Sequence, residues 1–418
     1  MSDKKIMQEK QTKKRKQKKW IKLRHKIVKA IAAPFLGTYA KRKMNITLEP
    51  FKGQEKRPYL ILMNHQTGYD QFFVDMVFKG PVYIVASEDI FSAGFVSKLL
   101  RFFIAPIPIK KNTHDRGAVL NCLRVAKEGG SIAIFPEGNR TYSGKTEYMS
   151  PSIAKLALML KIPIAFMRIE GGYGVQPRWS DVVRKGKMRA YVSRVMQPEE
   201  VATYSADELY SVIESELFVD ENLSTEQFLH TKSAEYLERA IYVCPDCGLS
   251  VFESKNDVIE CKTCHKQTRY LPNKQLQGIG FDFPFQNVGQ WYDYQTDFIS
   301  RLDISPFADT PAYVDEDVAL SKVTFYKRKH LLKKGITMCA FNDRLEFVDK
   351  DEKTIFALDE VSAVTVLGKN KLNVYLDNNK KVYQVKGNKR FNALKYVQFY
   401  HHYKNIKAGV ENGKFLGL

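Results

Sequence analysis

Five short apolar runs, rich in β-branched and aromatic side chains, recur between about residues 46 and 235. They are YLILMNH, VYIVAS, IAPIPI, SIAIFPEG and IPIAFMRI. Runs of this length bounded by turn-forming residues predict buried strands, and the stretches between them at 117–128 and 152–161 predict helices. Strands that alternate with helices indicate an α/β fold, with a mixed, largely parallel sheet flanked by helices.

The pattern changes towards the end of the chain, where strand-like runs follow one another directly. They are GITMCAF, RLEFVDK, AVTVLG, KLNVYLD and KVYQVKG. A final stretch places Phe391, Leu394, Val397 and Tyr400 three residues apart, along one side of a helix. We therefore predict a small β-barrel-plus-helix domain over residues 321–408.

The first 45 residues combine a basic arm with an apolar series. Residues 1–26 hold twelve Lys and Arg against two acidic residues, a surplus of ten out of a net charge of +20. Trp20, Leu23, Ile27, Ile31 and Phe35 follow at helical spacing. Segment 1–45 therefore predicts a basic amphipathic helix on an anionic membrane surface. A solvated tail before a helix packed on its own domain is the alternative.

The bulk composition limits the classes of protein that fit. A chain of 418 residues with 44% hydrophobic content can form several domains, and its pI of about 9.4 favours an anionic partner. No run of eighteen apolar residues appears, and the stretch 27–36 is too short for a signal peptide. We expect a peripheral or monotopic protein at the cytoplasmic face of the cell membrane.

Four of the six cysteines form two CxxC pairs, Cys244 with Cys247 and Cys261 with Cys264. Tetrahedral zinc with four thiolates requires paired turns of this kind, so residues 240–270 predict a zinc ribbon with a structural metal. A redox motif or two disulfides are the alternatives. Few aromatic residues are available there to stack bases, which makes nucleic acid an unlikely partner. Residues 271–320 lack a clear period and are predicted to be a connecting segment.

A candidate catalytic pair directly follows the strand YLILM, in the sequence from Asn64 to Asp70. On a regular helix, His65 and Asp70 would lie roughly 140° apart around the axis. In a strand-to-helix loop relaxed by Gly68 they can pair. Asp70 would then fix the imidazole tautomer, and His65 would take a proton from a hydroxyl that the substrate supplies.

Candidate anion-binding residues follow two other strands. Gly138 and Arg140 lie in FPEGNR, where glycine permits close approach of a ligand and arginine offers a planar fork for phosphate. The sequence IPIKKNTHDRG adds Lys110, Lys111 and Arg116 as further cations.

These blocks resemble those of the glycerolipid acyltransferase family, which includes 1-acylglycerol-3-phosphate acyltransferases. NHQTGYD is similar to the family's asparagine-histidine-four-residues-aspartate block, FPEGNR to its FPEG-x-R block and IPIAFMRI to its final proline-centred strand. The likeness spans roughly residues 45–200. Asn139 stands where Thr or Ser is usual, and the intermediate block ends in Lys110 and Lys111 where Arg is frequent.

The resemblance implies an acyltransferase domain over residues 46–235, with His65 as general base and Asp70 as its partner. It places Glu137, Gly138 and Arg140 in the acceptor site, and we assign Asn64 there as well. Which cation holds the acceptor's phosphate beside Arg140 is left open.

The reaction that it implies is transfer of a fatty acyl group from acyl-coenzyme A or acyl carrier protein to 1-acylglycerol 3-phosphate. The product is phosphatidic acid. Glycerol 3-phosphate or another lysolipid could be the acceptor, and a non-catalytic membrane- or nucleic-acid-binding adaptor is the alternative from another class.

The end domain resembles pleckstrin-homology-like domains in its pattern of strands and final helix. Its basic residues could contact lipid head groups or form an ordinary solvated face; they are Lys327, Arg328, Lys329, Lys333 and Lys334.

Overall fold

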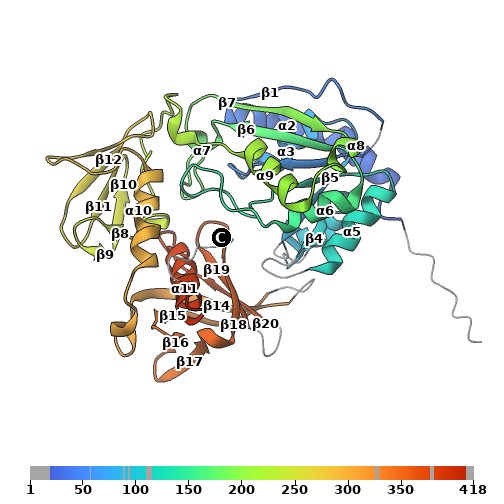
Figure 1. The fold of residues 1–418 in the computed structure, drawn as a ribbon. Helices are drawn as coiled ribbons and strands as arrows, with labels where there is room; N and C mark the ends of the chain where they lie inside the picture. Colours follow the sequence, from blue (N-terminus) through green and yellow to red (C-terminus); the bar gives the residue numbers. More distant parts are fainter. Residues whose placement is uncertain are drawn as a thin grey trace, which may run out of the picture.

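The computed structural model describes residues 19–56, 58–87, 90–92, 95–109, 115–324, 329–376 and 381–410 (Figure 1). Most of the predicted basic arm lies outside these residues. The candidate cations Lys110, Lys111, Lys327 and Arg328 also lie outside them.

The first part of the chain forms a seven-stranded sheet in the order β1-β7-β6-β2-β5-β3-β4. Every neighbouring pair is parallel except β6 and β7, which are antiparallel. The strands are β1 Ile46–Leu48, β2 Leu60–Met63, β3 Val82–Ser87, β4 Ile107–Ile109, β5 Ser131–Ile134, β6 Ile164–Glu170 and β7 Met188–Met196. The predicted mixed, largely parallel α/β sheet is confirmed, with all five predicted strands in it.

Helices cover both faces of this sheet, as the continuous apolar character of its central strand requires. In β2, Ile61 and Met63 belong to one core, which α2 and α3 cover, whereas Leu60 and Leu62 belong to the other, which α5, α6 and α9 cover. The helices are α2 Leu23–Met44, α3 Asp70–Val77, α4 Phe95–Phe103, α5 Arg116–Lys127, α6 Ser152–Leu160, α7 Gly172–Val175, α8 Pro198–Val201 and α9 Ala206–Leu217. Short 3₁₀ turns are η1 Ile90–Ser92, η2 Glu221–Leu223, η3 Leu237–Arg239, η4 Ser305–Phe307 and η5 Leu358–Glu360.

The cysteine-rich part is built from a two-stranded and a four-stranded antiparallel sheet. Its strands are β8 Val243–Cys244, β9 Gly248–Leu249, β10 Phe252–Lys255, β11 Val258–Cys261, β12 Gln267–Tyr270 and β13 Leu276–Gly278. Residues 271–320, predicted as a connecting segment, hold β13 and the helix α10, Val288–Ser300. The apolar period of α10 is interrupted by Gln295, which is fully buried and bonds the backbone of Tyr242 and Ala240.

The end of the chain forms a second seven-stranded sheet, antiparallel throughout, in the order β17-β16-β15-β14-β20-β19-β18. Its elements are β14 Tyr313–Val323, β15 His330–Ala340, β16 Arg344–Asp349, β17 Glu352–Ala357, β18 Val361–Leu367, β19 Lys371–Leu376, β20 Lys381–Lys386 and helix α11 Leu394–Lys407. No ladder among the described residues joins the edge strands β17 and β18, so the predicted barrel is open. Helix α11 packs against β18, where the Tyr400 hydroxyl donates to the Val361 carbonyl at 2.7 Å.

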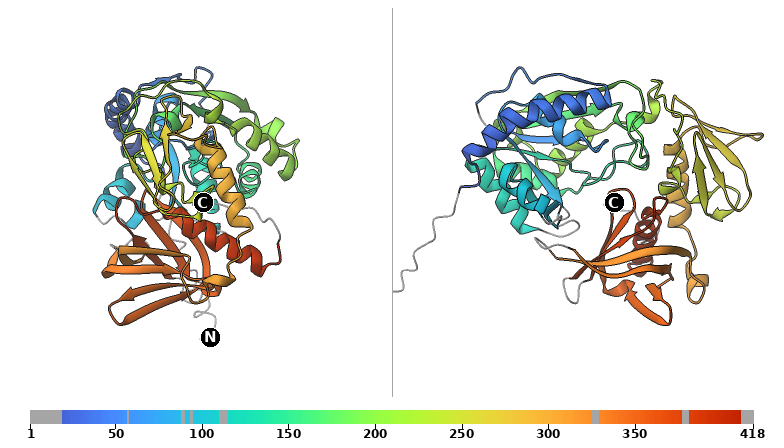
Figure 2. Two further views of the ribbon diagram at one scale, coloured as in Figure 1. Left: turned by 90° about the vertical axis from the view of Figure 1, so that its left-hand side faces the viewer. Right: turned by 180° about the vertical axis from the view of Figure 1, so that it is seen from behind.

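One hydrophobic core continues from the cysteine-rich sheets through α10 and α11 into the end sheet, and it includes Tyr142 and Trp179 of the first part. Helices α10 and α11 lie side by side between the cysteine-rich part and the end sheet (Figure 2). The boundary predicted between residues 270 and 321 therefore crosses a continuous core, and the division into separate domains stays a prediction. No helix within the described ranges is both long and apolar enough to cross a bilayer.

Candidate active site

His65 lies in the loop between the carboxyl end of β2 and helix α3, and Asp70 is the first residue of that helix. The Oδ2 atom of Asp70 lies 2.9 Å from Nδ1 of His65. The same oxygen accepts hydrogen bonds from the backbone N–H groups of Gln66 at 2.8 Å and Thr67 at 2.9 Å. The loop therefore brings together two side chains that a regular helix would separate.

This pairing decides which nitrogen of His65 can act as a base. A buried carboxylate is an acceptor, so it binds the protonated Nδ1 and leaves the lone pair on Nε2. The imidazole also stacks on the Phe135 ring, with centroids 4.1 Å apart. The His65 side chain is still 20% exposed, so the ring is held in place while it can meet a substrate.

The surroundings of His65 lower the pKa of its imidazole from the ordinary value of 6.5. Burial is the largest cause. The hydrogen bond and the charge of Asp70 raise the pKa, and the charges of Arg140 and Arg178 lower it. A lowered pKa keeps the imidazole neutral near pH 7, which is the form that accepts a proton.

Asn64 and Glu137 hold the scaffold of the site, whereas contact of either side chain with an acceptor stays a prediction. The Asn64 side chain exchanges two hydrogen bonds of 2.8 Å with the backbone of Ile169 on β6. The buried Glu137 carboxylate accepts the backbone N–H groups of His65 and Glu147, each at 2.8 Å. Backbone N–H and carbonyl groups at strand ends lack a partner in the sheet, and these two side chains provide their hydrogen bonds.

The turn after β5 points Arg140 towards the catalytic loop. Gly138 adopts a φ of +67° and donates its N–H to the Phe135 carbonyl at 2.9 Å. One guanidinium nitrogen of Arg140 lies 4.0 Å from where a Cβ on Gly68 would be. Within the described part of the chain, Arg140 forms no ion pair. Arg116, by contrast, is exposed at the start of α5.

Arg178 is a second cation near His65, and it was not among the predicted site residues. Its side chain is buried and donates to the Arg140 carbonyl at 3.0 Å and to Oδ1 of Asn139 at 3.3 Å. The guanidinium lies over the Tyr142 ring, 4.4 Å from its centroid. Arg178 follows α7 in a stretch without strand or helix periodicity, so no signal in the sequence identified it.

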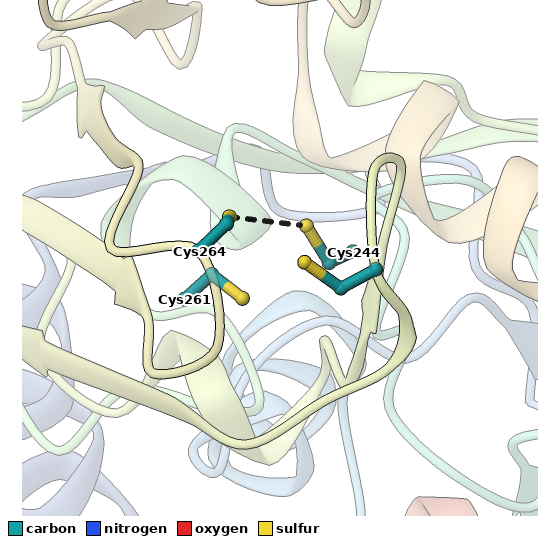
Figure 3. A group of neighbouring side chains, drawn as sticks. Cys244, Cys261 and Cys264 are labelled. Carbon is teal, nitrogen blue, oxygen red and sulfur yellow. Dashed lines mark hydrogen bonds between the residues drawn. The ribbon is translucent and has the colours of Figure 1, made fainter.

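The four predicted metal ligands also come together. Sγ atoms of Cys244, Cys247, Cys261 and Cys264 all lie within 4.8 Å of one another. Cys244 and Cys264 approach from two separate hairpin turns to 3.9 Å (Figure 3). Tetrahedral zinc with Zn–S bonds of about 2.3 Å places its sulfurs ~3.8 Å apart, so the cluster fits such an ion. His265 is adjacent but its side chain is 71% exposed.

Known proteins are similar to the part of the chain that holds His65, Asp70 and Arg140. The family model described as Acyltransferase matches residues 44–170. A 1-acyl-sn-glycerol-3-phosphate acyltransferase of Borreliella burgdorferi is 28% identical over 105 residues, which are 25% of this chain and 42% of that protein. The chain thus matches less than half the length of this curated relative.

Among solved structures, this chain is similar to the 1-acyl-sn-glycerophosphate (LPA) acyltransferase PlsC of Thermotoga maritima. The similarity covers 45% of this chain and 78% of the PlsC chain. The TM-score is 0.39 and the sequence identity 18%.

Proposed function

We propose that this chain, whose residues 44–170 match the Acyltransferase family model, moves a fatty acyl group from a thioester to 1-acylglycerol 3-phosphate. The product would be phosphatidic acid. The observation that carries the proposal is the 2.9 Å pairing of His65 with Asp70 beside Arg140, a cation without an ion pair among the described residues.

In the proposed reaction, Nε2 of His65 removes the proton from the free hydroxyl of the acceptor. The oxygen then attacks the thioester carbonyl, and the tetrahedral intermediate collapses as the carbon–sulfur bond breaks. The leaving thiolate takes the proton back from His65. Asp70 stabilises the imidazolium that exists between the two proton transfers. This scheme requires no covalent acyl-enzyme, because the substrate supplies the nucleophile.

The acceptor's phosphate is proposed to bind Arg140. A guanidinium forms two parallel hydrogen bonds with phosphate oxygens, and an unpaired cation beside a base suits a dianionic acceptor. Gly138, exposed in its positive-φ turn, leaves room for close approach. Asn64 and Glu137 would position this site without touching the acceptor.

Zinc is proposed as a structural ion held by Cys244, Cys247, Cys261 and Cys264. Four thiolates fill a tetrahedral coordination sphere, so the ion would have no open position for catalysis. It would fix the two hairpin turns against the core that they share with α10 and the end sheet.

We further propose that α2 and α4 rest on a membrane surface. Leu23, Ile27, Ile31 and Phe35 of α2 are between 50% and 76% exposed, and Phe95 of α4 is 71% exposed. Exposed apolar side chains beside a basic arm are typical of interfacial helices. The lysolipid acceptor and its product would then stay at the membrane surface.

The experiment that tests this function measures acyl transfer with two donors and two acceptors. Acyl-coenzyme A and acyl carrier protein are each supplied with 1-acylglycerol 3-phosphate or glycerol 3-phosphate in mixed micelles. We expect turnover that depends on the lysolipid, and the donor that supports it identifies the thioester. Turnover with glycerol 3-phosphate alone would contradict the proposed acceptor, and no turnover with any pair would contradict the enzyme.

A further inference from the structure

The turn between β18 and β19 belongs to the end sheet but contacts the loops of the α/β part, which it faces in Figure 1. Nζ of Lys369 lies 2.7 Å from Oδ1 of Asp181. Nη2 of Arg178 donates to the Val366 carbonyl at 3.4 Å. The end sheet is therefore joined directly to the residues that position Arg140.

Positive charge exceeds negative charge around this contact. Arg239 and Lys369 share the carboxylate of Asp181, to which Arg239 donates two hydrogen bonds of 2.8 and 3.3 Å. Neither Arg140 nor Arg178 has an ion pair within the part of the chain that the structure describes. Two cations at this contact thus share one carboxylate, and the two arginines beside it lack an ion pair within the described ranges.

Three other carboxyl groups lie nearby, and none of them forms an ion pair with Arg140 or Arg178 among the described residues. Glu137 accepts from the backbone of His65 and Glu147. Asp70 accepts from His65 and its own loop. Glu147 accepts from the Thr141 and Ser143 hydroxyls and from the Tyr142 N–H. A cation that is held away from water without an ion pair is costly, and an anion bound beside Arg140 would relieve that cost.

Lys369 is placed to join such an anion. The side chain is 30% exposed, and its flexible stem allows the ammonium to leave Asp181, which Arg239 would still neutralise through two hydrogen bonds. Burial lowers the pKa of Lys369, Asp181 raises it, and the charges of Arg140 and Arg239 lower it. The charge of Arg140 thus acts on Lys369, and the hydrogen bond from Arg178 to Val366 brings the same turn to the Arg140 loop.

We propose that Lys369, carried by the end sheet, is the second cation of the acceptor's phosphate site, beside Arg140. The ligand class is a phosphate monoester dianion, and the inference rests on the proposed function. Arg178 is then a positioning residue that connects the Asn139–Arg140 turn to β18. The end sheet would thus form part of the acceptor site.

The test compares acceptor kinetics of the full chain with Lys369→Gln, Lys369→Arg and Lys334→Gln. Lys334 is exposed on β15 of the same sheet, so its variant makes the same charge change away from Arg140. We expect Lys369→Gln to raise KM for 1-acylglycerol 3-phosphate roughly tenfold with little change in kcat, as for loss of one charged hydrogen bond. Lys369→Arg should restore most of the affinity, and Lys334→Gln should match the wild type.

Substitution of Asp181 distinguishes a role of Lys369 in acceptor binding from a role in docking the end sheet only. If the pair only docks the sheet, Asp181→Asn and Lys369→Gln should change KM in the same direction, and Asp181→Asn should lower Tm more because it also removes the ion-pair partner of Arg239. If Lys369 binds the acceptor, Asp181→Asn frees the ammonium, so KM should stay equal or fall while Lys369→Gln raises it. Parallel changes in KM for both variants would overturn the inference.

A binding measurement separates this inference from the proposed reaction. Calorimetric titration with glycerol 3-phosphate requires no turnover, so it reports the phosphate site even if the wild type transfers no acyl group. Weaker binding in Lys369→Gln than in Lys334→Gln supports the site independently of the chemistry. Equal binding by wild type and Lys369→Gln would refute it, whatever the activity.

Discussion

The His65 imidazole has one carboxylate and two arginines as neighbours, which act on its pKa in opposite directions. Because burial and the arginines outweigh Asp70, the pKa lies below 6.5. The base is therefore neutral at lower pH than an ordinary histidine would be.

The first prediction concerns the acid side of the pH profile. Protonation of His65 removes the base, so kcat/KM should fall only as pH drops through this lowered pKa, below 6.5. Arg178→Gln removes a lowering charge and should move this limb to higher pH, whereas Arg178→Lys should leave it nearly in place. The prediction would be contradicted if kcat/KM of the wild type fell with a midpoint above pH 6.5, or if Arg178→Gln left that midpoint unchanged.

The second prediction concerns the tautomer of His65. Asp70→Asn replaces an acceptor by an amide that can donate to Nδ1, which would put the proton on Nε2. We expect kcat to fall roughly 10³-fold or more, by analogy with the aspartate of serine-protease triads. Asp75→Asn, on the same helix, removes a carboxylate that pairs with Lys29 and serves as the control. A change below tenfold in Asp70→Asn would argue against the assigned role.

The sequence alone predicted that His65 and Asp70 pair, and it pointed to Arg140 as a cation of the site. His65 and Asp70 could be paired from loop chemistry because they lie five positions apart. A motif records which residue is present and not where its side chain points, so the hydrogen bonds of Asn64 and Glu137 to the backbone could not be predicted. Lys369 could not be found, because it reaches Asp181 from a turn 188 positions away.

The catalytic loop and the turn after β5 are two elements that Glu137 connects. Its two oxygens accept one backbone N–H from each. Replacing one oxygen by an NH₂ group would set a donor against a donor in a buried place.

Glu137→Gln should therefore destabilise the fold by roughly 2 kcal/mol and lower kcat, since His65 would lose its anchoring contact. Glu199→Gln, in the exposed first turn of α8, is the matched control. Thermal unfolding of both variants checks the prediction. A Glu137→Gln variant with the Tm and kcat of the wild type would show that the two hydrogen bonds of Glu137 contribute to neither stability nor catalysis.

Helix α2 offers a second prediction at this scale. Replacing Ile27, Ile31 and Phe35 together by Asn should weaken binding to anionic vesicles at least roughly tenfold, because each loses apolar contact with the interface. Leu223→Asn, 80% exposed on η2, tests whether any exposed apolar side chain would have the same effect. Sedimentation with vesicles measures both, and equal binding by the triple variant and wild type would contradict membrane contact by α2.

Five strands of each seven-stranded sheet were predictable because apolar runs between turn formers leave few alternatives, whereas β1, β7, β14 and β17 were not predicted. Helix α10 was not, since its buried side includes Gln295, whose hydrogen bonds the sequence does not reveal. The end domain was predicted as strands followed by one helix, and β17 and β18 form the two edges of its sheet. Which strands pair at the edges depends on contacts that single-chain patterns do not encode.

Over the whole molecule, the cysteine cluster, α10 and the end sheet share one core, and the end sheet contacts the residues around Arg140. Loss of metal should therefore affect a site outside the cysteine-rich sheets. The cluster itself needs no catalytic role for this coupling.

Removal of zinc by a strong chelator should lower Tm and raise KM for the acceptor, with kcat less affected, because the end sheet would lose its fixed position. Cys247→Ser should reproduce both effects, whereas Cys122→Ser, in a buried helix position far from the cluster in sequence, should not raise KM. Metal analysis must show about one zinc per chain in the wild type. A chain without bound metal and with normal stability would contradict the structural ion.

The central claim is that His65 is the base of an acyl transfer, and the most direct test is acceptor-dependent thiol release by wild type and His65→Ala. His330→Ala, which removes an exposed histidine of β15, is the control. The account predicts thiol release only when 1-acylglycerol 3-phosphate is present, lost in His65→Ala and retained in His330→Ala. Undiminished release by a folded His65→Ala variant would contradict it.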